Sequence, residues 1–179
     1  MLLTDAPSKE KVLDFVVQAN TVQMNTPSFV DELKTWIRFS DQEAIEKRDG
    51  LSTKASGNPS VPRWLGSLLF SQFYTPEAEN EKYAKHIRSS SGIAIFSAEI
   101  ADKKHWIEVG RCYQRFALQA TTLNIRNAFI NQPIEVATFR LPFAQAFGLN
   151  SQGVDLIVRF GRGSTMPHSL RRPVAAVLV

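Results

Sequence analysis

The chain has 179 residues, 44% of them hydrophobic and 21% charged, which suits one globular domain with a substantial core. Its net charge of +4 and pI near 9.4 allow anionic partners, but basic residues are interleaved with acidic ones and form no run, which argues against a nucleic-acid-binding arm. The sequence lacks an apolar run of about 18 residues and a secretory signal, and Cys112 is its single cysteine, so we expect a cytoplasmic protein without a membrane span or internal disulfide.

The first sixty residues predict two helices and a polar segment. Ser8 is suited to cap a helix over about 9–20, and Ser28 begins a second helix. Apolar residues recur at helical spacing in the second helix: Phe29, Leu33, Trp36 and Ile37. The stretch 41–60 is polar and glycine-containing, which predicts a loop or a mobile flap over a site.

The middle of the chain predicts three helices and a strand. Pro62 and Pro76 each open a short helix, because proline is favoured in a first helical turn. Gly92–Ser97 reads as a short strand, and Asp102 is suited to cap the longest helix, over about 103–123.

The last third predicts alternating strands and a helix. Strands are expected at Ile125–Ile130, Val154–Phe160 and Val174–Val179, and a helix at Val136–Phe147. Strand, long helix, strand, helix and strand in this order indicate an α+β fold with one central mixed sheet.

A basic pair follows the strand that ends at Phe160. Gly161 and Gly163 punctuate a turn, and Arg171 and Arg172 precede Pro173, which keeps its neighbour extended. Two guanidinium groups on such a segment could clamp a phosphate, because the planar fork matches phosphate oxygens. The alternative is a solvated basic loop.

Side-chain catalytic motifs are not apparent. The three histidines are far apart in the sequence, which argues against a metal site, and Cys112 falls inside the long helix, where a small buried hydrophobe is the expected role. Nucleophile-elbow, dinucleotide-fingerprint and P-loop patterns are missing. If the protein is an enzyme, a cofactor therefore carries its chemistry.

The stretch GIAIFSAEIADKKHWIEVGRCYQRFALQATTLNIRNAFINQPIE, followed by DLIVRFGRG and SLRRPV, resembles the FMN-dependent nitroreductase family. Within it, the chain is most similar to the C-terminal lobe of the tandem nitroreductase-like (Acg-related) proteins. The resemblance covers Ser91–Val179 and, more loosely, Phe29–Leu51.

The resemblance implies a single nitroreductase-like domain over 1–179, with 61–179 as its best-supported core. Its fold would be a mixed, mostly antiparallel sheet flanked by helices, with a long central helix. It implies a homodimer that binds FMN and passes hydride from NAD(P)H to a nitroaromatic, a quinone or a similar small-molecule acceptor, with no nucleic-acid or membrane partner.

The resemblance also assigns residues. Arg171 and Arg172, beside Ser169, would hold the FMN phosphate, and Val174–Val179 would be a strand that reaches a partner subunit. The segment that passes the reactive edge of the flavin ring would contain Ile130, Asn131 and Gln132.

The sequence departs from the family near its start, where members carry an Arg-x-Ser element that grips the cofactor. Arg38-Phe39-Ser40 has this spacing but follows a different element. Two alternatives therefore stay open: a non-catalytic protein that binds or sequesters flavin, and one lobe of a larger protein that no longer completes a flavin site. Weak nucleic-acid binding through Arg159, Arg162, Arg171 and Arg172 is a third hypothesis, based on the pI alone.

Overall fold

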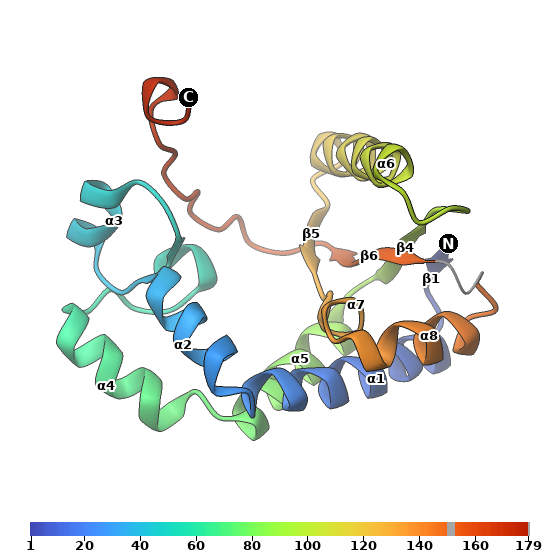
Figure 1. Ribbon diagram of the computed structural model, residues 1–179, viewed down its shortest axis with the longest axis horizontal. Coiled ribbons are helices and arrows are strands. Elements are labelled where there is room, and N and C mark those ends of the chain that lie inside the picture. The colour runs from blue at the N-terminus through green and yellow to red at the C-terminus, as the bar shows by residue number, and fades with distance from the viewer. Residues whose placement is uncertain (150–152, 179) are drawn as a thin grey trace. The chain divides into compact units, whose positions relative to one another are not determined.

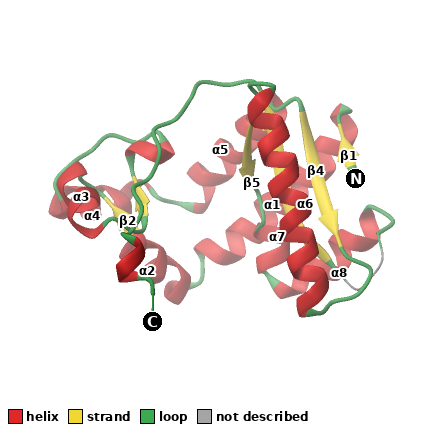
Figure 2. Cartoon of the chain, turned by 90° about the horizontal axis from the view of Figure 1, so that it is seen from above, coloured by secondary structure: helices red, strands yellow, loops and turns green. Residues whose placement is uncertain are grey.

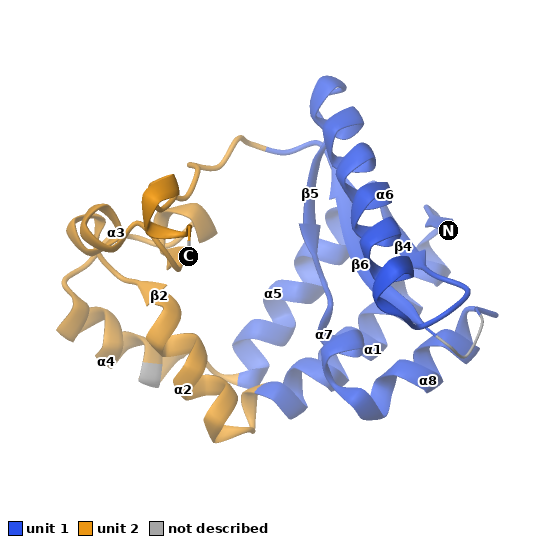
Figure 3. Ribbon diagram, turned by 45° about the horizontal axis from the view of Figure 1, so that its top comes forward, with its two compact units in different colours: residues 1–23, 76–163 blue, residues 24–75, 164–179 orange. Residues whose placement is uncertain are grey.

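The computed structural model describes residues 1–149 and 153–178 and divides the chain into two compact units (Figure 3). Unit 1 comprises Met1–Gln23 and Pro76–Gly163, and unit 2 comprises Met24–Thr75 and Ser164–Val179. Each unit is described by itself below. The single domain expected over 1–179 stays a prediction, because compact units occur within domains as well as between them.

Unit 1 is built on a four-stranded sheet in the order β1-β4-β6-β5. Its strands are β1 (Leu2–Leu3), β4 (Gly92–Ser97), β5 (Arg126–Phe129) and β6 (Val154–Gly161). Each neighbouring pair is antiparallel, so the predicted α+β class and the antiparallel character of the sheet are confirmed, while the expected mixed pairing is not found in this sheet among the described residues. The predicted strands at 92–97, 125–130 and 154–160 all form, to within a residue at each end.

Helices cover both faces of this sheet. Figures 1 and 2 agree that α6 (Lys103–Thr122) lies on one face and that α1 (Ala6–Met24), α5 (Pro76–Ser89) and α8 (Ala137–Ala146) lie on the other. A short helix, α7 (Gln132–Glu135), links β5 to α8. The predicted helix over 136–147 is thus confirmed as α8.

The face toward α1 and α5 carries the aliphatic core. Ile93, Ile95 and Ile157 project from paired positions of β4 and β6, and each is at most 2% exposed. They pack in one cluster with the fully buried side chains of Val12, Val16, Ile87 and Phe143. Burial of each such side chain contributes about 1.5–3 kcal/mol, so this cluster holds α1, α5 and α8 against the sheet.

The face toward α6 carries aromatic rings. Phe116 of α6 packs edge-on against Phe96 of β4 at 5.6 Å and against Phe160 of β6 at 5.8 Å between ring centroids.

At the start of α6, the Asp102 carboxylate accepts a hydrogen bond from the backbone N–H of His105 at 2.9 Å. The predicted cap and the long helix are both confirmed.

Two other helix starts differ from prediction by a few residues. Asp5, rather than Ser8, caps α1, because its Oδ1 accepts the Ser8 N–H at 2.8 Å. The second helix, α2 (Pro27–Trp36), begins after Thr26 with Pro27 in its first turn, where the missing N–H of proline has no cost.

Unit 2 contains α2, a two-stranded parallel pair and two more helices. The pair joins β2 (Ile37–Arg38) to β3 (Leu51–Ser52). The helices are α3 (Asp41–Lys47) and α4 (Arg63–Phe73), and single 3₁₀ turns occur at Lys54–Ser56 and Val174–Ala176. The helix predicted to start at Pro62 is α4.

The prediction of a polar loop over 41–60 is wrong in its first part. Ser40 caps α3 by accepting the Glu43 N–H at 3.1 Å, and Arg48 ends it in the left-handed region. Ser-x-x-Glu matches the capping-box pattern, and the Ser40 half of it forms, while Glu43 accepts the N–H of Phe39 instead of that of Ser40.

The strand predicted at Val174–Val179 is also wrong over 174–178; Val179 lies outside the described residues. Val174–Ala176 forms a 3₁₀ turn, and Val174 and Leu178 are 70% and 73% exposed. A strand needs a paired neighbour to satisfy its backbone groups, and no described strand pairs with this segment.

Candidate functional site

The predicted residues Ile130, Asn131 and Gln132 form a tight turn between β5 and α7 in unit 1. Ile130 is fully buried, and its N–H donates to the Ile157 carbonyl oxygen at 2.9 Å. The Asn131 side-chain oxygen accepts the Ile157 N–H at 2.8 Å, and the Asn131 carbonyl oxygen accepts the N–H groups of Ile134 and Glu135 in α7. Backbone and side-chain bonds to β6 therefore fix this turn in place.

Gln132 has a buried amide oxygen that lacks a partner. Its side chain is buried, with 8% of the residue exposed, and its Oε1 makes no hydrogen bond with the residues that the structure describes. A buried polar atom without a partner is unusual in native proteins and costs about 1–3 kcal/mol. Such an atom marks a place where a ligand or water is expected.

Tyr83 of α5 lies beside Gln132. Burial, followed by the charge of Glu79, raises the pKa of the Tyr83 hydroxyl to about 12, while a hydrogen-bonding contribution from the Gln132 side chain opposes this rise. The hydroxyl is therefore protonated at neutral pH and can donate a hydrogen bond.

Arg159 of β6 lies on the face of the sheet that carries Ile157. It is half-buried, and burial lowers the pKa of its guanidinium, with an opposing contribution from Tyr83. Within the described part of the chain, its guanidinium has neither an ion pair nor a hydrogen bond. None of its nitrogens is a buried atom without a partner, so solvent or a ligand can reach the guanidinium.

His86 lies one turn of α5 from Tyr83. Burial lowers the pKa of its imidazole, and the positive charges of Arg159, Lys82 and Lys85 lower it further. We refer to Tyr83, His86, Gln132 and Arg159 as the Gln132 cluster. Perturbed titratable groups beside an unpartnered buried polar atom are typical of functional sites.

Gln132 is among the site residues predicted from the sequence, whereas Tyr83 and His86 are not. Arg159 offers one signal in the sequence, because it and Asp155 are the two charged residues of the mainly apolar strand β6. The two α5 residues carry no such signal, because only the packing of α5 on the sheet brings them there.

The predicted phosphate residues Ser169, Arg171 and Arg172 lie in unit 2, in a segment without regular structure. Arg171 and Arg172 are exposed, and neither makes a hydrogen bond or ion pair with the described residues. Pro173 is extended, with φ −61° and ψ 149°. Both guanidinium groups are thus available to a ligand or partner.

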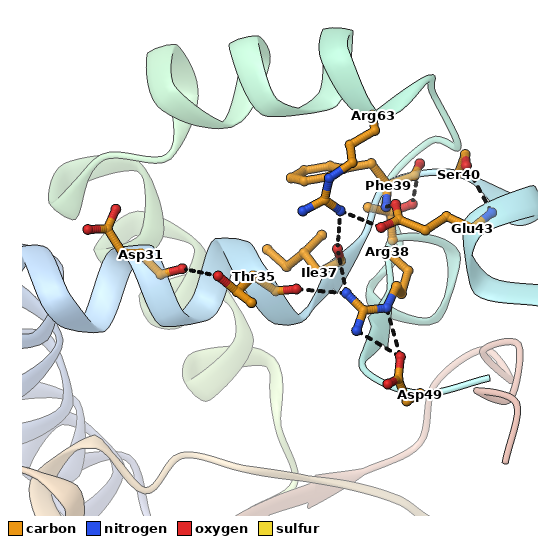
Figure 4. Close-up of polar contacts among 10 residues, drawn as sticks. Asp31, Thr35, Ile37, Arg38, Phe39, Ser40, Glu43, Asp49 and Arg63 are labelled. Carbon is orange, nitrogen blue, oxygen red and sulfur yellow. Dashed lines mark hydrogen bonds and ion pairs between the residues drawn. The ribbon is translucent and has the colours of Figure 1, made fainter. Parts of the chain in front are cut away.

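Arg38 of the Arg-Phe-Ser stretch is buried in unit 2 (Figure 4). Its guanidinium donates to Asp49 Oδ1 at 2.7 and 2.9 Å and to the Thr35 carbonyl at 2.7 Å. Gly50 permits this loop, because a Cβ there would lie 2.2 Å from the Trp36 carbonyl oxygen. Arg38 is engaged inside the protein and is not available to hold a cofactor.

A second ion pair in Figure 4 joins α3 to α4. Glu43 is buried; one of its oxygens pairs with Arg63, and the other accepts the Phe39 N–H at 3.3 Å. The Arg63 guanidinium also lies 5.7 Å from the centre of the Phe39 ring. These contacts hold α3, β2 and α4 together, which is a structural role.

Unit 1 also has an open groove of about 670 Å³ between α6, α8 and the start of β6. Trp106, Val109 and Leu141 line it, with Arg140 and Asp155 as its charged residues. Asp155 is engaged, because its Oδ2 accepts the Ala98 N–H at 2.9 Å.

Among the described residues, no three histidine, cysteine or acidic side chains gather as a metal site, and none of the described helices is both long and apolar enough to cross a bilayer. The chain matches no protein-family model, no curated protein and no solved structure.

Proposed function

We propose that this chain is an FMN-dependent oxidoreductase of nitroreductase type, which takes hydride from NAD(P)H and reduces a nitroaromatic, a quinone or a similar acceptor as a homodimer. The observation that carries the proposal is the chain order β4, α6, β5, α8, β6. Its three strands belong to one antiparallel sheet. This order spans the residues on which the family resemblance rests.

Two features of the side chains suit a flavin. The turn Ile130–Gln132, which the resemblance assigns to the reactive edge of the ring, is rigid and leaves the Gln132 amide oxygen without a partner. Arg171 and Arg172, assigned to the phosphate, are exposed and have no partner among the described residues. FMN would supply the hydride chemistry, and the chain would bind and orient it.

The homodimer is supported by apolar surface. Trp106, Ile107 and Leu118 of α6 are each more than half exposed, and so are Val174 and Leu178 of the C-terminal segment. Large exposed apolar side chains are typical of surfaces that a partner covers. A second copy would bury α6 and give the C-terminal segment a neighbour.

A second candidate function is a non-catalytic flavin-binding protein. Arg38 favours it, because the residue at the Arg-x-Ser spacing is committed to Asp49 and cannot grip the cofactor. A flavin held from one end only would be bound loosely or positioned poorly for turnover.

Steady-state assays separate the two candidates. The purified chain with excess FMN is mixed with NADH or NADPH and either a quinone or a nitroaromatic acceptor. The leading proposal predicts nicotinamide oxidation that depends on protein and acceptor. Bound flavin without such oxidation would favour the non-catalytic alternative.

A further inference from the structure

Arg159 lies on the face of the sheet that α1 and α5 cover (Figure 2), opposite Ile93 of β4 and Ala128 of β5 in the register. None of its five N–H donors finds an acceptor among the described residues. None of its nitrogens is a buried atom without a partner either, so the guanidinium is open to solvent or to a ligand.

The charges around Arg159 are not balanced. Three cations, Lys82, Lys85 and Arg159, act on His86. Glu79 pairs with Lys82 at 3.5 Å, and Glu135, whose charge offsets a second cation, accepts a hydrogen bond from the neutral amide of Gln23 at 2.7 Å. The balance of these five groups is one positive charge, which favours an anion.

The neutral groups of the cluster suit an oxyanion as well. The Tyr83 hydroxyl is protonated at neutral pH and can donate. The free end of the Gln132 amide presents its oxygen or, after rotation by 180°, its two N–H groups. A guanidinium fork beside a hydroxyl and an amide matches the oxygens of a phosphate or a carboxylate.

We propose that Arg159, Tyr83 and Gln132 form a binding site for a small oxyanion, a phosphate or a carboxylate group. Arg159 supplies the charge and the paired donors, Tyr83 supplies a hydroxyl donor, and Gln132 supplies the N–H groups of its rotated amide. All three residues belong to unit 1. The site shares Gln132 with the turn assigned to the flavin ring, but binding of a small oxyanion does not require flavin.

Ligand-observed NMR tests the proposal on the full, FMN-free chain at constant ionic strength. Inorganic phosphate and benzoate are titrated separately, because the tighter of the two identifies the oxyanion class. Arg159→Met should weaken binding by roughly tenfold or more, since a hydrogen bond to a charged group is lost. Arg162→Met, the matched control, removes the same charge from an exposed position and should change binding less than twofold.

The readout is separate from the flavin proposal, because a chain that fails to bind FMN can still bind phosphate or benzoate. If Arg159→Met does not fold, Tyr83→Phe decides, with an expected loss of roughly fivefold. Wild-type protein that binds neither anion at about 1 mM, or an Arg159 variant that binds like the wild type, would overturn the proposal. If Arg159→Met does not fold, unchanged anion binding by Tyr83→Phe would also overturn the proposal.

Discussion

The side-chain oxygen of Asn131 accepts a 2.8 Å hydrogen bond from the backbone N–H of Ile157, which joins the turn after β5 to the middle of β6. Ile157 is fully buried, so its N–H has no access to water. The bond therefore fixes the turn that carries Gln132 relative to the strand that carries Arg159. Together with the Ile130 N–H bond to the Ile157 carbonyl oxygen, it holds the turn of the Gln132 cluster against β6.

Asn131→Ala should destabilise the chain by about 1–3 kcal/mol, because it leaves the buried Ile157 N–H without an acceptor. Urea denaturation followed by circular dichroism measures the change. Asn58→Ala is the control, since its side chain makes only an exposed contact to Ser56. A variant as stable as the wild type would show that the turn is held by other means.

Arg171→Ala combined with Arg172→Ala should weaken FMN binding by at least about two orders of magnitude, because two charged hydrogen bonds to the phosphate are lost. Stability should change little, since both side chains are exposed. Quenching of flavin fluorescence measures the affinity. Riboflavin, which lacks the phosphate, should bind the wild type and the double variant equally; full FMN affinity in the double variant would refute the clamp.

Arg38→Met should destabilise the chain by about 3 kcal/mol, because it leaves Asp49 without its buried partner. The FMN affinity of the folded variant should stay within about twofold of the wild type, since Arg38 is engaged with Asp49 and Thr35. A double-mutant cycle with Asp49→Asn isolates the pair. Selective loss of FMN binding would instead assign Arg38 to the cofactor.

His86 should make stability fall in acid. Burial holds the pKa of His86 in the folded chain below its ordinary value of about 6.5, so the unfolded chain binds more protons at His86. The stability that neutral His86 contributes is therefore lost as pH falls through about 6.5 and then through the folded pKa. The denaturation midpoint should fall less between neutral and mildly acidic pH for His86→Gln than for the wild type. Exposed His168→Gln is the control; parallel pH profiles for wild type and His86→Gln would contradict the prediction.

Local signals predicted much of unit 1. Asp102 as a helix cap, the apolar run Gly92–Ser97 and the long periodic stretch after it all formed where expected. These features depend on neighbouring residues alone, which is why sequence patterns reveal them. The Ser40 cap of α3 is equally local, but the polar composition of 41–60 favoured a loop in the prediction.

Other features needed the folded chain. The strand predicted at the C-terminus has β-branched residues but no described neighbour to pair with, so propensity alone could not decide it. Tyr83 and Arg159 influence each other's pKa only because α5 packs on the face of β6 that carries Arg159. Because these residues are far apart in the sequence, no local sequence pattern predicts that they lie in one cluster.

The most direct test of the flavin proposal is the visible absorption of the purified chain after incubation with FMN and removal of free flavin by gel filtration. The proposal predicts flavin absorption that elutes with the protein and is lost in the Arg171→Ala and Arg172→Ala double variant. A colourless protein that stays free of FMN at excess flavin would contradict it.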